Sequence, residues 1–289
     1  MTEKSLAPVN ASAAHVFDIL RHISSASAPL GVAEIGRQLD LPTTTVHRAL
    51  VTLEQTEFAA RMQTAPRYEL GPMPQYLARA LFRRLPLRAA ATPYLAAIAK
   101  ATGETTSLGL RLGWHQVRVA IAYGGNDLHS PGRLGAVHLL HRGAASRIIL
   151  AFLTPHERTR YRRFLLRHHP SLLGETTSEP SRRSLIETRR RGVAGEGIEA
   201  GAGRYALAFP VRGPDGAAVA SIFVNGPVAS GAPQALARPG WARPVDDLEA
   251  MIRAKPEILA HPYAHLDPDA ILFDLRRQED ATGAWLPSL

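Results

Sequence analysis

The stretch from Pro29 to Glu57 constrains the fold of this chain more than any other, because it predicts two short amphipathic helices separated by a tight turn. Apolar residues of the first helix share one face, at the spacing i, i+3 and i+7: Val32, Ile35 and Leu39. Gly31 is a suitable N-cap, and Glu34 favours the positive start of the helix. Leu41-Pro42 ends the helix, because proline has no N–H and moves the preceding residue out of the α region.

The second predicted helix has a buried stripe and a polar face. Thr43 is predicted to cap it, and three apolar residues form the stripe: Val46, Leu50 and Leu53. Threonine can bond phosphates or touch a thymine methyl, and arginine can contact a phosphate or a guanine edge. The helix therefore suits DNA recognition, although a small helical hairpin with a solvated face is the alternative. The candidate DNA-binding residues here are Thr43, Thr44, Thr45, His47 and Arg48.

The segment from Phe58 to Leu70 follows the predicted recognition helix directly. It contains two strand-like runs around Thr64-Ala65-Pro66, with Arg61 and Arg67 beside them. A β-hairpin in this place is the wing of a winged helix, and its basic residues can reach phosphates or the minor groove. We therefore add Arg61 and Arg67 to the candidate DNA contacts.

Composition is consistent with a cytoplasmic DNA-binding protein. The formal charge of +9 agrees with a polyanionic partner, and 45% hydrophobic residues in 289 are ample for two packed domains. Cysteine is absent, which excludes disulfides and thiolate metal sites. The N-terminus has no apolar run typical of a signal peptide, and no stretch approaches 18 uninterrupted apolar residues. We expect a soluble protein with no membrane contact.

The pattern of segments predicts an α+β protein with two domains and a linker helix between them. Alternating runs at 105–113 and 116–124 indicate a hairpin, 144–153, 155–168 and 181–191 indicate helices, and 205–227 indicates two strands around a Pro-Asp-Gly turn. An alanine-rich helix from Tyr94 to Thr102 ends at Gly103. In the linker helix, from Met73 to Leu87, one apolar face suits pairing with a second copy: Tyr76, Leu77, Ala80 and Leu81.

After residue 227 the sequence becomes rich in alanine, glycine and proline, and two further helices are predicted, at 246–252 and 265–277. This extension has three possible roles: to cover the sheet, to exchange with a partner chain, or to fray. The predicted ranges are 1–11 for a disordered lead, 12–72 for the winged helix-turn-helix, 73–88 for the linker helix, 89–228 for the second domain and 229–289 for the extension.

Several motifs in this order resemble the IclR-type transcriptional regulators, over about residues 13–228. They are VFDILRHIS, LPTTTVHRALVTLE, YELGP, TGETTSLGLR, RRRGVAGEG, the FPV run and VNGP. The resemblance implies an N-terminal winged helix, a dimerising linker helix and a GAF-like C-terminal domain with an antiparallel sheet, packed helices and a small-molecule effector. It also implies a homodimer or a homotetramer built from two dimers.

Only some of the family's effector-contacting residues have a counterpart in this sequence. Ala144 and Ala145 stand where a helix presents its backbone to the ligand, after a motif that is altered here. Glu196 stands at an often acidic position and Ala206 at a frequent cysteine, while Phe223 and Asn225 replace common serines. A larger, partly apolar effector is therefore expected, with Asn225 and either Glu196 or Arg111 at its polar end, whereas a small keto acid is expected to bind poorly. Phe223 as a simple core residue is the alternative.

Other chemistries have weak support in the sequence. His129, His138 and His141 lack an arranged carboxylate or cysteine, so no metal site is expected. A lone glycine pair near Tyr205 lacks the frame of a dinucleotide site, and there is no GxSxG motif. We expect no catalytic residue and no cofactor. Ten arginines against four acids between residues 157 and 191 suggest a DNA-facing surface, an interchain surface or a solvated helix face.

The sequence therefore predicts a sequence-specific transcriptional regulator that binds double-stranded operator DNA. A small effector in the C-terminal domain is expected to modulate this binding. The alternative is a ligand sensor or enzyme whose winged helix contacts protein. The absence of any salt-dependent DNA affinity would favour the alternative over the DNA-binding regulator, because contacts to phosphates release counterions.

Overall fold

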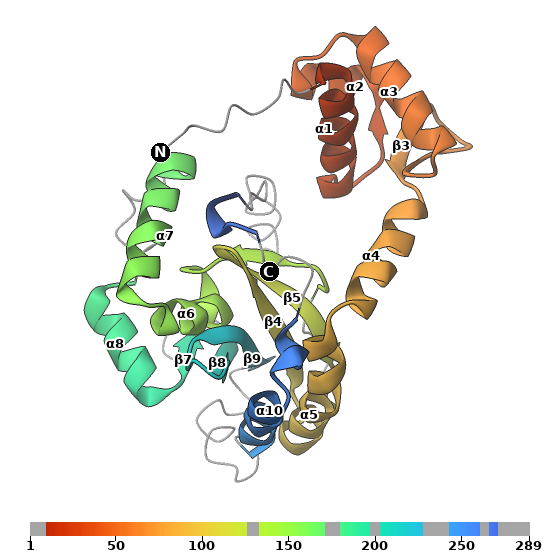
Figure 1. Cartoon of the computed structure of the whole chain (residues 1–289). Helices are drawn as coiled ribbons and strands as arrows, with labels where there is room; N and C mark the ends of the chain where they lie inside the picture. Colours follow the sequence, from red (N-terminus) through yellow and green to blue (C-terminus); the bar gives the residue numbers. More distant parts are fainter. Residues whose placement is uncertain are drawn as a thin grey trace. The chain divides into compact units, whose positions relative to one another are not determined.

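The computed structural model describes residues 10–125, 133–170, 180–196, 203–227, 243–260 and 266–270. The chain forms two compact units, one up to Leu81 and the other from Phe82 to Leu275. Figure 1 shows the helices and strands along the chain. The proposed disordered lead, apart from its last two residues, lies outside the described residues, and so do most of the residues after 260.

The first unit is a winged helix. Its three helices precede a small antiparallel sheet in which β3 lies between β1 and β2. Three residues separate the end of the third helix from the hairpin of β2 and β3, as expected for the wing. The elements are α1 (Ala11–Ser25), β1 (Leu30–Gly31), α2 (Val32–Leu39), α3 (Thr43–Gln55), β2 (Ala59–Arg61) and β3 (Arg67–Leu70).

The helices of this unit pack on one apolar core, and the predicted stripe of α3 is confirmed as part of it. The core residues include Ile19 of α1, Ile35 of α2 and, from α3, Val46, Leu50 and Leu53. Gly36 allows the turn between α2 and α3 to be tight, because a Cβ there would lie 2.9 Å from the carbonyl oxygen of Leu41. Asp40 closes α2 in the left-handed region at φ 52.

The expected capping of α3 by Thr43 is wrong. Thr43 is the first helical residue, and the N-cap position is occupied by Pro42, which offers no side-chain acceptor. The carbonyl of Pro42 instead accepts the first helical hydrogen bond, from Val46 N at 3.1 Å. The hydroxyl of Thr43 therefore has no capping role and lies on an exposed residue at the start of the helix.

The two helices expected at 73–87 and 94–102 are present, but the break between them lies earlier in the chain. Helix α4 spans Met73–Arg83 and α5 spans Pro86–Thr102, so the expected end at Leu87 and the expected start at Tyr94 are both wrong. Proline at the first position of α5 disfavours the α conformation at Leu85, which has φ −113 and ψ 85 and separates the two helices. Pro93 is accommodated inside α5, where the sequence pattern had suggested a helix start.

The second unit contains a six-stranded antiparallel sheet in the order β6-β5-β4-β9-β8-β7. Its two expected hairpins are confirmed by the pairings β4–β5 and β8–β9. Long-range pairing of β4 with β9 joins them at the centre of the sheet. The strands are β4 (Thr105–Leu112), β5 (His115–Ala122), β6 (Val137–Leu139), β7 (Ala194–Glu196), β8 (Arg204–Arg212) and β9 (Ala218–Pro227).

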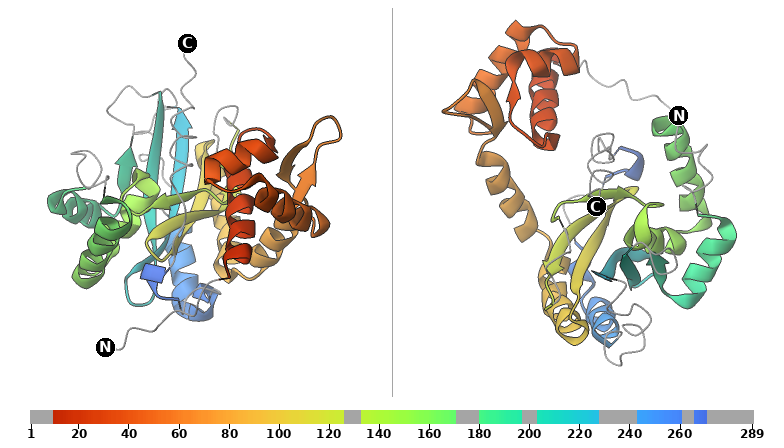
Figure 2. Two further views of the ribbon diagram at one scale, coloured as in Figure 1. Left: turned by 90° about the horizontal axis from the view of Figure 1, so that it is seen from above. Right: turned by 180° about the vertical axis from the view of Figure 1, so that it is seen from behind.

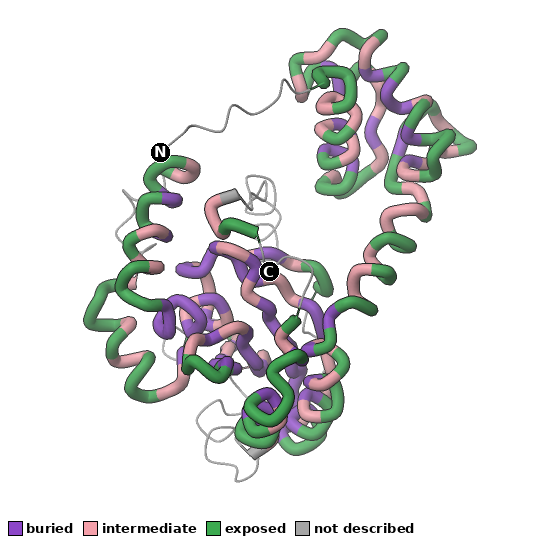
Figure 3. Tube along the Cα trace, in the orientation of Figure 1, coloured by how far each residue is buried: buried purple, intermediate pink, exposed green. Residues whose placement is uncertain are grey.

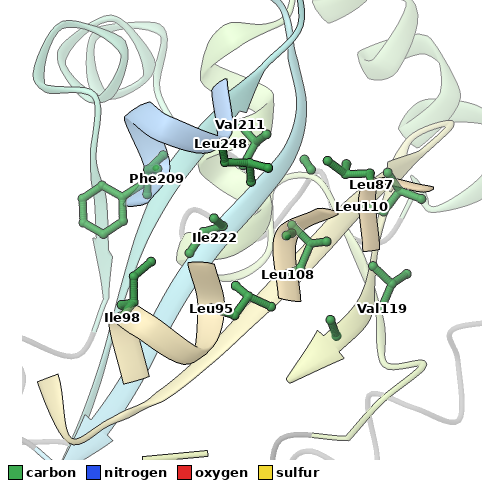
Figure 4. Packing of buried hydrophobic residues seen from close by; sticks show 14 of the residues in the cluster. Leu87, Leu95, Ile98, Leu108, Leu110, Val119, Phe209, Val211, Ile222 and Leu248 are labelled. Atoms are coloured by element: carbon green, nitrogen blue, oxygen red, sulfur yellow. The ribbon is translucent and has the colours of Figure 1, made fainter. Parts of the chain in front are cut away.

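Helices cover the two faces of this sheet differently. On one face, α5 and α10 (Arg243–Ala254) pack over a core of leucine, isoleucine, valine and phenylalanine (Figures 2 and 4). Leu95 and Ile98 of α5 and Leu248 of α10 point toward β4, β8 and β9 in that core (Figure 4). On the other face lies α6 (Gly143–Phe152), with Ile148 packed in the same cluster as Phe223 of β9.

Part of the predicted C-terminal extension belongs to this second unit. Helix α10 is longer than the predicted 246–252, and Val245, Leu248 and Ile252 lie in the sheet core. Helix α10 therefore has the first of the three roles considered for the extension, since it covers the sheet. The predicted helix at 265–277 is described only at 266–270, where the 3-10 turn η5 (Pro268–Ala270) lies, and another 3-10 turn, η4 (Pro256–Leu259), follows α10.

Two further helices, α7 (Pro155–His168) and α8 (Arg182–Arg191), follow α6 in the chain. Asp269 of η5 accepts hydrogen bonds from Trp114 Nε1 at 2.5 Å and from Arg160 of α7 at 2.7 Å, which ties η5 to the unit. No helix among the described residues is both long and apolar enough to cross a membrane.

Candidate DNA interface and effector site

The solvent-facing side of α3 presents the polar residues expected to contact DNA. Thr43, Thr44, His47 and Arg48 are exposed, and Thr45 is half-buried. On the opposite side Val46 and Leu50 are fully buried. The helix therefore keeps its recognition face accessible while its apolar side is fixed in the core, which is the arrangement that base readout requires.

The two wing arginines differ in how their guanidinium groups are bonded. Arg67 donates from Nε to the carbonyl oxygen of Pro29 at 2.8 Å and from a terminal nitrogen to Glu34 at 3.0 Å. These bonds join the wing to β1 and to the start of α2. Arg61 is exposed at the end of β2, and the described residues contain no ion pair that it forms.

Three of the predicted effector residues lie side by side across the second sheet. Glu196 of β7 pairs with Ala206 of β8, and Ala206 pairs with Asn225 of β9. Phe223 lies two residues before Asn225 on the same face, and α6 covers this face. Glu196 also accepts a hydrogen bond from the backbone N–H of Ala144 at 2.8 Å, which places its carboxylate at the N-terminus of α6.

The remaining predicted effector residues have different positions. Ala145 is half-buried on α6 beside the same apolar cluster. Arg111 lies six residues along β4 from Thr105, which is the residue paired with Asn225. It is therefore distant from Glu196, Ala206 and Asn225. Its guanidinium donates to Glu157 at 2.8 Å and to the carbonyl of Gly113 at 3.2 Å, and it lies 5.6 Å from the centre of the Trp114 ring.

Polar residues that the sequence analysis did not select lie under α6 on the central strands. Ser107 of β4 pairs with Phe223, and Gly109 lies between Ser221 of β9 and Arg118 of β5. Gly109 leaves room for the side chain of Gln116, since a Cβ at this position would lie 1.8 Å from its Nε2. The signal in the sequence is the alternation of polar residues with apolar ones along β4, β5 and β9, since alternate residues face the same side of a sheet.

Several of these buried polar atoms have no hydrogen-bond partner within the described part of the chain. A buried polar group without a partner is rare in proteins and suggests a missing water or ligand. Six side chains contribute them: four are each at most 1% exposed, and the other two, Asn225 and Arg118, are half-buried. The atoms are Ser107 Oγ, Ser146 Oγ, Ser221 Oγ, Gln116 Nε2, Asn225 Oδ1 and Arg118 Nε.

Charged groups surround this region of the sheet. Burial lowers the pKa of Arg118 to about 10, and its guanidinium lies 4.9 Å from the centre of the Phe223 ring. Burial also lowers the pKa of His138, and the charges of Arg118 and Arg142 lower it further while Glu196 opposes them. Neutral His138, which pairs with Gln116 across β5 and β6, therefore offers both a donor and an acceptor at neutral pH.

The described residues contain no group of three histidine, aspartate or glutamate side chains placed to hold a metal ion. His129 of the proposed histidine group lies outside the described residues. His141 instead lies 2.7 Å from the hydroxyl of Tyr161 through Nδ1, inside the core.

The arginine-rich region forms the exposed sides of α7 and α8. A groove of about 430 Å³ between these helices is lined by four arginines, with Leu185 and Ile186 among its apolar residues. Glu157 is bonded to Arg111, and Glu187 to Arg190 and Arg191. The lining arginines are Arg158, Arg162, Arg182 and Arg189.

A winged helix with an accessible recognition face, together with a sheet domain that contains buried unsatisfied polar atoms, defines a DNA-binding protein with a ligand-binding domain. Comparisons with known proteins agree. Residues 12–62 match the IclR helix-turn-helix domain, and residues 79–234 match the bacterial transcriptional regulator IclR C-terminal domain. This chain belongs to the IclR family of transcriptional regulators.

Individual relatives span most of the chain. It is 32% identical over 221 residues to the probable transcriptional regulator SauR of Cupriavidus necator, covering 76% of this chain and 87% of that protein. It is 29% identical over 215 residues to the glycerol operon regulatory protein of Streptomyces griseus, covering 73% and 82%. These matches extend across both domains, so the chain is a DNA-binding regulator with a C-terminal ligand-binding domain.

Solved structures show the same fold. An IclR homologue of Microbacterium hydrocarbonoxydans in complex with 4-hydroxybenzoate has a TM-score of 0.66 at 20% identity, covering 85% of this chain and all of that one. A regulator from Rhodococcus has a TM-score of 0.68 at 21% identity, covering 85% and 98%. Both confirm the expected α+β architecture of a helix-turn-helix domain followed by an antiparallel sheet with helices.

Proposed function

We propose that this chain binds a near-palindromic operator as a dimer, in the cytoplasm, through α3 and the wing. The observation that supports this most directly is the exposed polar face of α3, opposite a stripe that is fully buried. In the proposal base edges are contacted by Thr44, Thr45, His47 and Arg48, and the phosphate backbone by Thr43 and Arg61. Arg67, which is bonded to Pro29 and Glu34, holds the wing in place. The proposal contains no catalytic step.

We further propose that a partly apolar small molecule binds between the second sheet and α6 and changes operator affinity. Ala206 and Phe223 make this region apolar, and the unsatisfied atoms of Ser107, Ser221 and Asn225 provide hydrogen bonds. The half-buried residues Ala206 and Asn225, together with exposed Glu196, form the accessible end of the site. By analogy, the homologue in complex with 4-hydroxybenzoate supports a small organic ligand for this fold.

The test of the DNA proposal is binding of the purified protein to the intergenic DNA beside its own gene, titrated against salt. We expect affinity to fall steeply as salt increases, because each phosphate contact releases a counterion. Arg48→Ala should weaken operator binding by about 1–3 kcal/mol and relax one base position. Arg21→Ala is the matched control, since Arg21 is an exposed arginine of α1 that is paired with Asp18.

Two results would contradict the proposal. If Arg48→Ala bound the operator as tightly as the parent protein, Arg48 would have no part in base readout. If binding did not depend on salt, the winged helix would not contact DNA phosphates, and a protein partner would replace DNA in the proposal.

A further inference from the structure

The groove between α7 and α8 combines positive charge with apolar surface. It has a volume of about 430 Å³ and lies between two helices with exposed outer sides (Figure 3). Its apolar lining includes Leu185, which is half-buried, and Ile186, which is 58% exposed. Its charged lining comes from both helices, with Arg158 and Arg162 on α7 and Arg182 and Arg189 on α8. A partner that fits this groove therefore carries negative charges beside apolar groups.

In the described part of the chain, no acidic side chain neutralises the four arginines that line this groove. Each of the two helices has one acidic residue, and both carboxylates are bonded elsewhere. Glu157 accepts hydrogen bonds from Arg111 and from the backbone N–H of Thr154. Glu187 accepts hydrogen bonds from Arg190 and Arg191, which do not line the groove. The positive charges of the lining therefore attract an acidic partner.

Two of the four arginines are held in position by the end of α6. Arg158 donates a hydrogen bond to the carbonyl oxygen of Leu153 at 2.9 Å, and the guanidinium of Arg189 lies 5.4 Å from the centre of the Phe152 ring. A guanidinium has five N–H donors, so neither contact uses its full capacity for hydrogen bonds. Because these side chains are already oriented, less side-chain entropy is lost when a partner binds.

The lining favours an acidic peptide over the other possible occupants. A DNA backbone would pair with the arginines but would leave Ile186 without an apolar contact. A symmetric contact between two copies of the groove would place arginines against arginines, which is unfavourable. An amphipathic helix with carboxylates beside its apolar stripe matches both the charged and the apolar parts of the lining.

We propose that the groove between α7 and α8 binds an acidic amphipathic helix of a protein partner. Carboxylates of the partner pair with the four arginines, and its apolar side chains contact Leu185 and Ile186. When the regulator is bound to its operator, it thereby brings this partner to the DNA. That consequence rests on the proposed operator binding, whereas the peptide site itself does not.

The test measures binding of fluorescent peptides to the full-length protein by anisotropy. The probe is a short helical peptide of glutamate, leucine and alanine, with its leucines at i, i+3, i+4 and i+7. In one control peptide lysine replaces every glutamate, and in the other serine replaces every leucine. We expect the probe to bind about tenfold more tightly than either control and to lose affinity as salt increases. Equal binding of either control, or binding of none of the three peptides, would overturn the inference.

Two double variants with the same change in net charge test the position of the site. Arg162→Glu with Arg182→Glu reverses two charges of the lining and should weaken binding of the probe by about tenfold or more. Arg163→Glu with Arg183→Glu changes the neighbouring exposed arginines, which do not line the groove, and should bind the probe nearly as the parent protein does. Equal binding of the probe by the two double variants would overturn the inference.

A pair of apolar variants tests the apolar part of the groove. Ile186→Asn removes an apolar contact from the lining, whereas Leu166→Asn changes a residue of α7 outside it. The two parent side chains are 58% and 56% exposed, so neither change is expected to disturb the core. Ile186→Asn should weaken binding of the probe several-fold and Leu166→Asn should not. Undiminished binding by Ile186→Asn would exclude Ile186 from the site and overturn the inference.

Operator titration and sedimentation of the two double variants identify the other possible occupants. If the Arg162→Glu, Arg182→Glu protein bound the operator more weakly than its control, DNA would occupy the groove and the inference would be wrong. A change of oligomeric state in this variant alone would assign the groove to a second copy of the chain and would also overturn the inference. If the parent protein bound the probe through these arginines but bound no operator, the peptide site would be supported and the proposed operator binding would be wrong.

Discussion

The arginines of this protein differ most in whether the guanidinium is already bonded within the fold. Arg67 bonds to the backbone of Pro29 and to Glu34, and Arg111 bonds to Glu157. Arg61 and Arg118 form no such ion pair among the described residues. An arginine with satisfied donors stabilises the structure around it, whereas one without a partner is available to a ligand or to DNA.

This difference predicts opposite behaviour for the two wing arginines. Arg67→Ala should lower the free energy of unfolding by about 0.5–1 kcal/mol, because it removes an exposed ion pair and a hydrogen bond to Pro29. Arg61→Ala should leave stability unchanged and weaken DNA binding, with a smaller dependence on salt. Chemical denaturation and operator titration of both variants measure the two effects. Equal loss of stability in the two variants would contradict this assignment.

At the scale of whole elements, α4 and α8 differ from the other helices because no residue of either is buried (Figure 3). Tyr76 and Leu77 of α4 are 67% and 48% exposed, and both belong to its apolar face. A helix with an uncovered apolar face is suited to pairing with a second copy. We therefore retain the linker-helix dimer as part of the proposed function.

A charge on this face tests the dimer. Leu77→Glu should shift the protein from dimer to monomer and lower its affinity for a palindromic operator, because a buried carboxylate would have no partner at the interface. Gln75→Glu adds the same charge on the opposite side of α4 and should preserve the dimer. Analytical ultracentrifugation gives the oligomeric state. A Leu77→Glu protein that sediments as the parent does would exclude α4 as the main dimer contact.

At the scale of the whole molecule, buried histidines make stability depend on pH. Burial lowers the pKa of His115 and of His141 to about 4, and nearby positive charges, His169 for both and Arg142 for His141, contribute to the lowering. The ordinary value in the unfolded chain is 6.5, so between pH 6.5 and 4 the unfolded state binds more protons than the folded state. Stability should therefore rise with pH through this window and reach its full value above it.

The expected effect is a loss of about 2 kcal/mol of unfolding free energy for each histidine between pH 7.5 and pH 5. Denaturant titration at the two pH values measures it. His141→Asn should reduce the difference, whereas His156→Asn, a change at an exposed residue of α7, should not. Equal stability of the parent protein at pH 5 and pH 7.5 would contradict the prediction.

Most elements of this fold could be predicted from the sequence because their signals are local. The period of apolar residues in α3 and in the paired hairpins, together with turn residues such as Pro-Asp-Gly, identified elements that the structure contains. The break at Leu85-Pro86 also has a local cause, the proline, although the predicted helix at 73–87 runs through it. Local signals thus predicted the winged helix and the two hairpins of the second sheet.

The tertiary structure decided which side chains meet and which remain without partners. The sequence alone could not show that Arg118 lies over Phe223, more than 100 positions further along the chain, or that Arg67 is bonded to Glu34. It also could not show that Glu196, Ala206 and Asn225 lie in one row across three strands. The physical reason is that local periodicity determines the face on which a side chain lies, whereas long-range strand pairing and helix packing determine its neighbours.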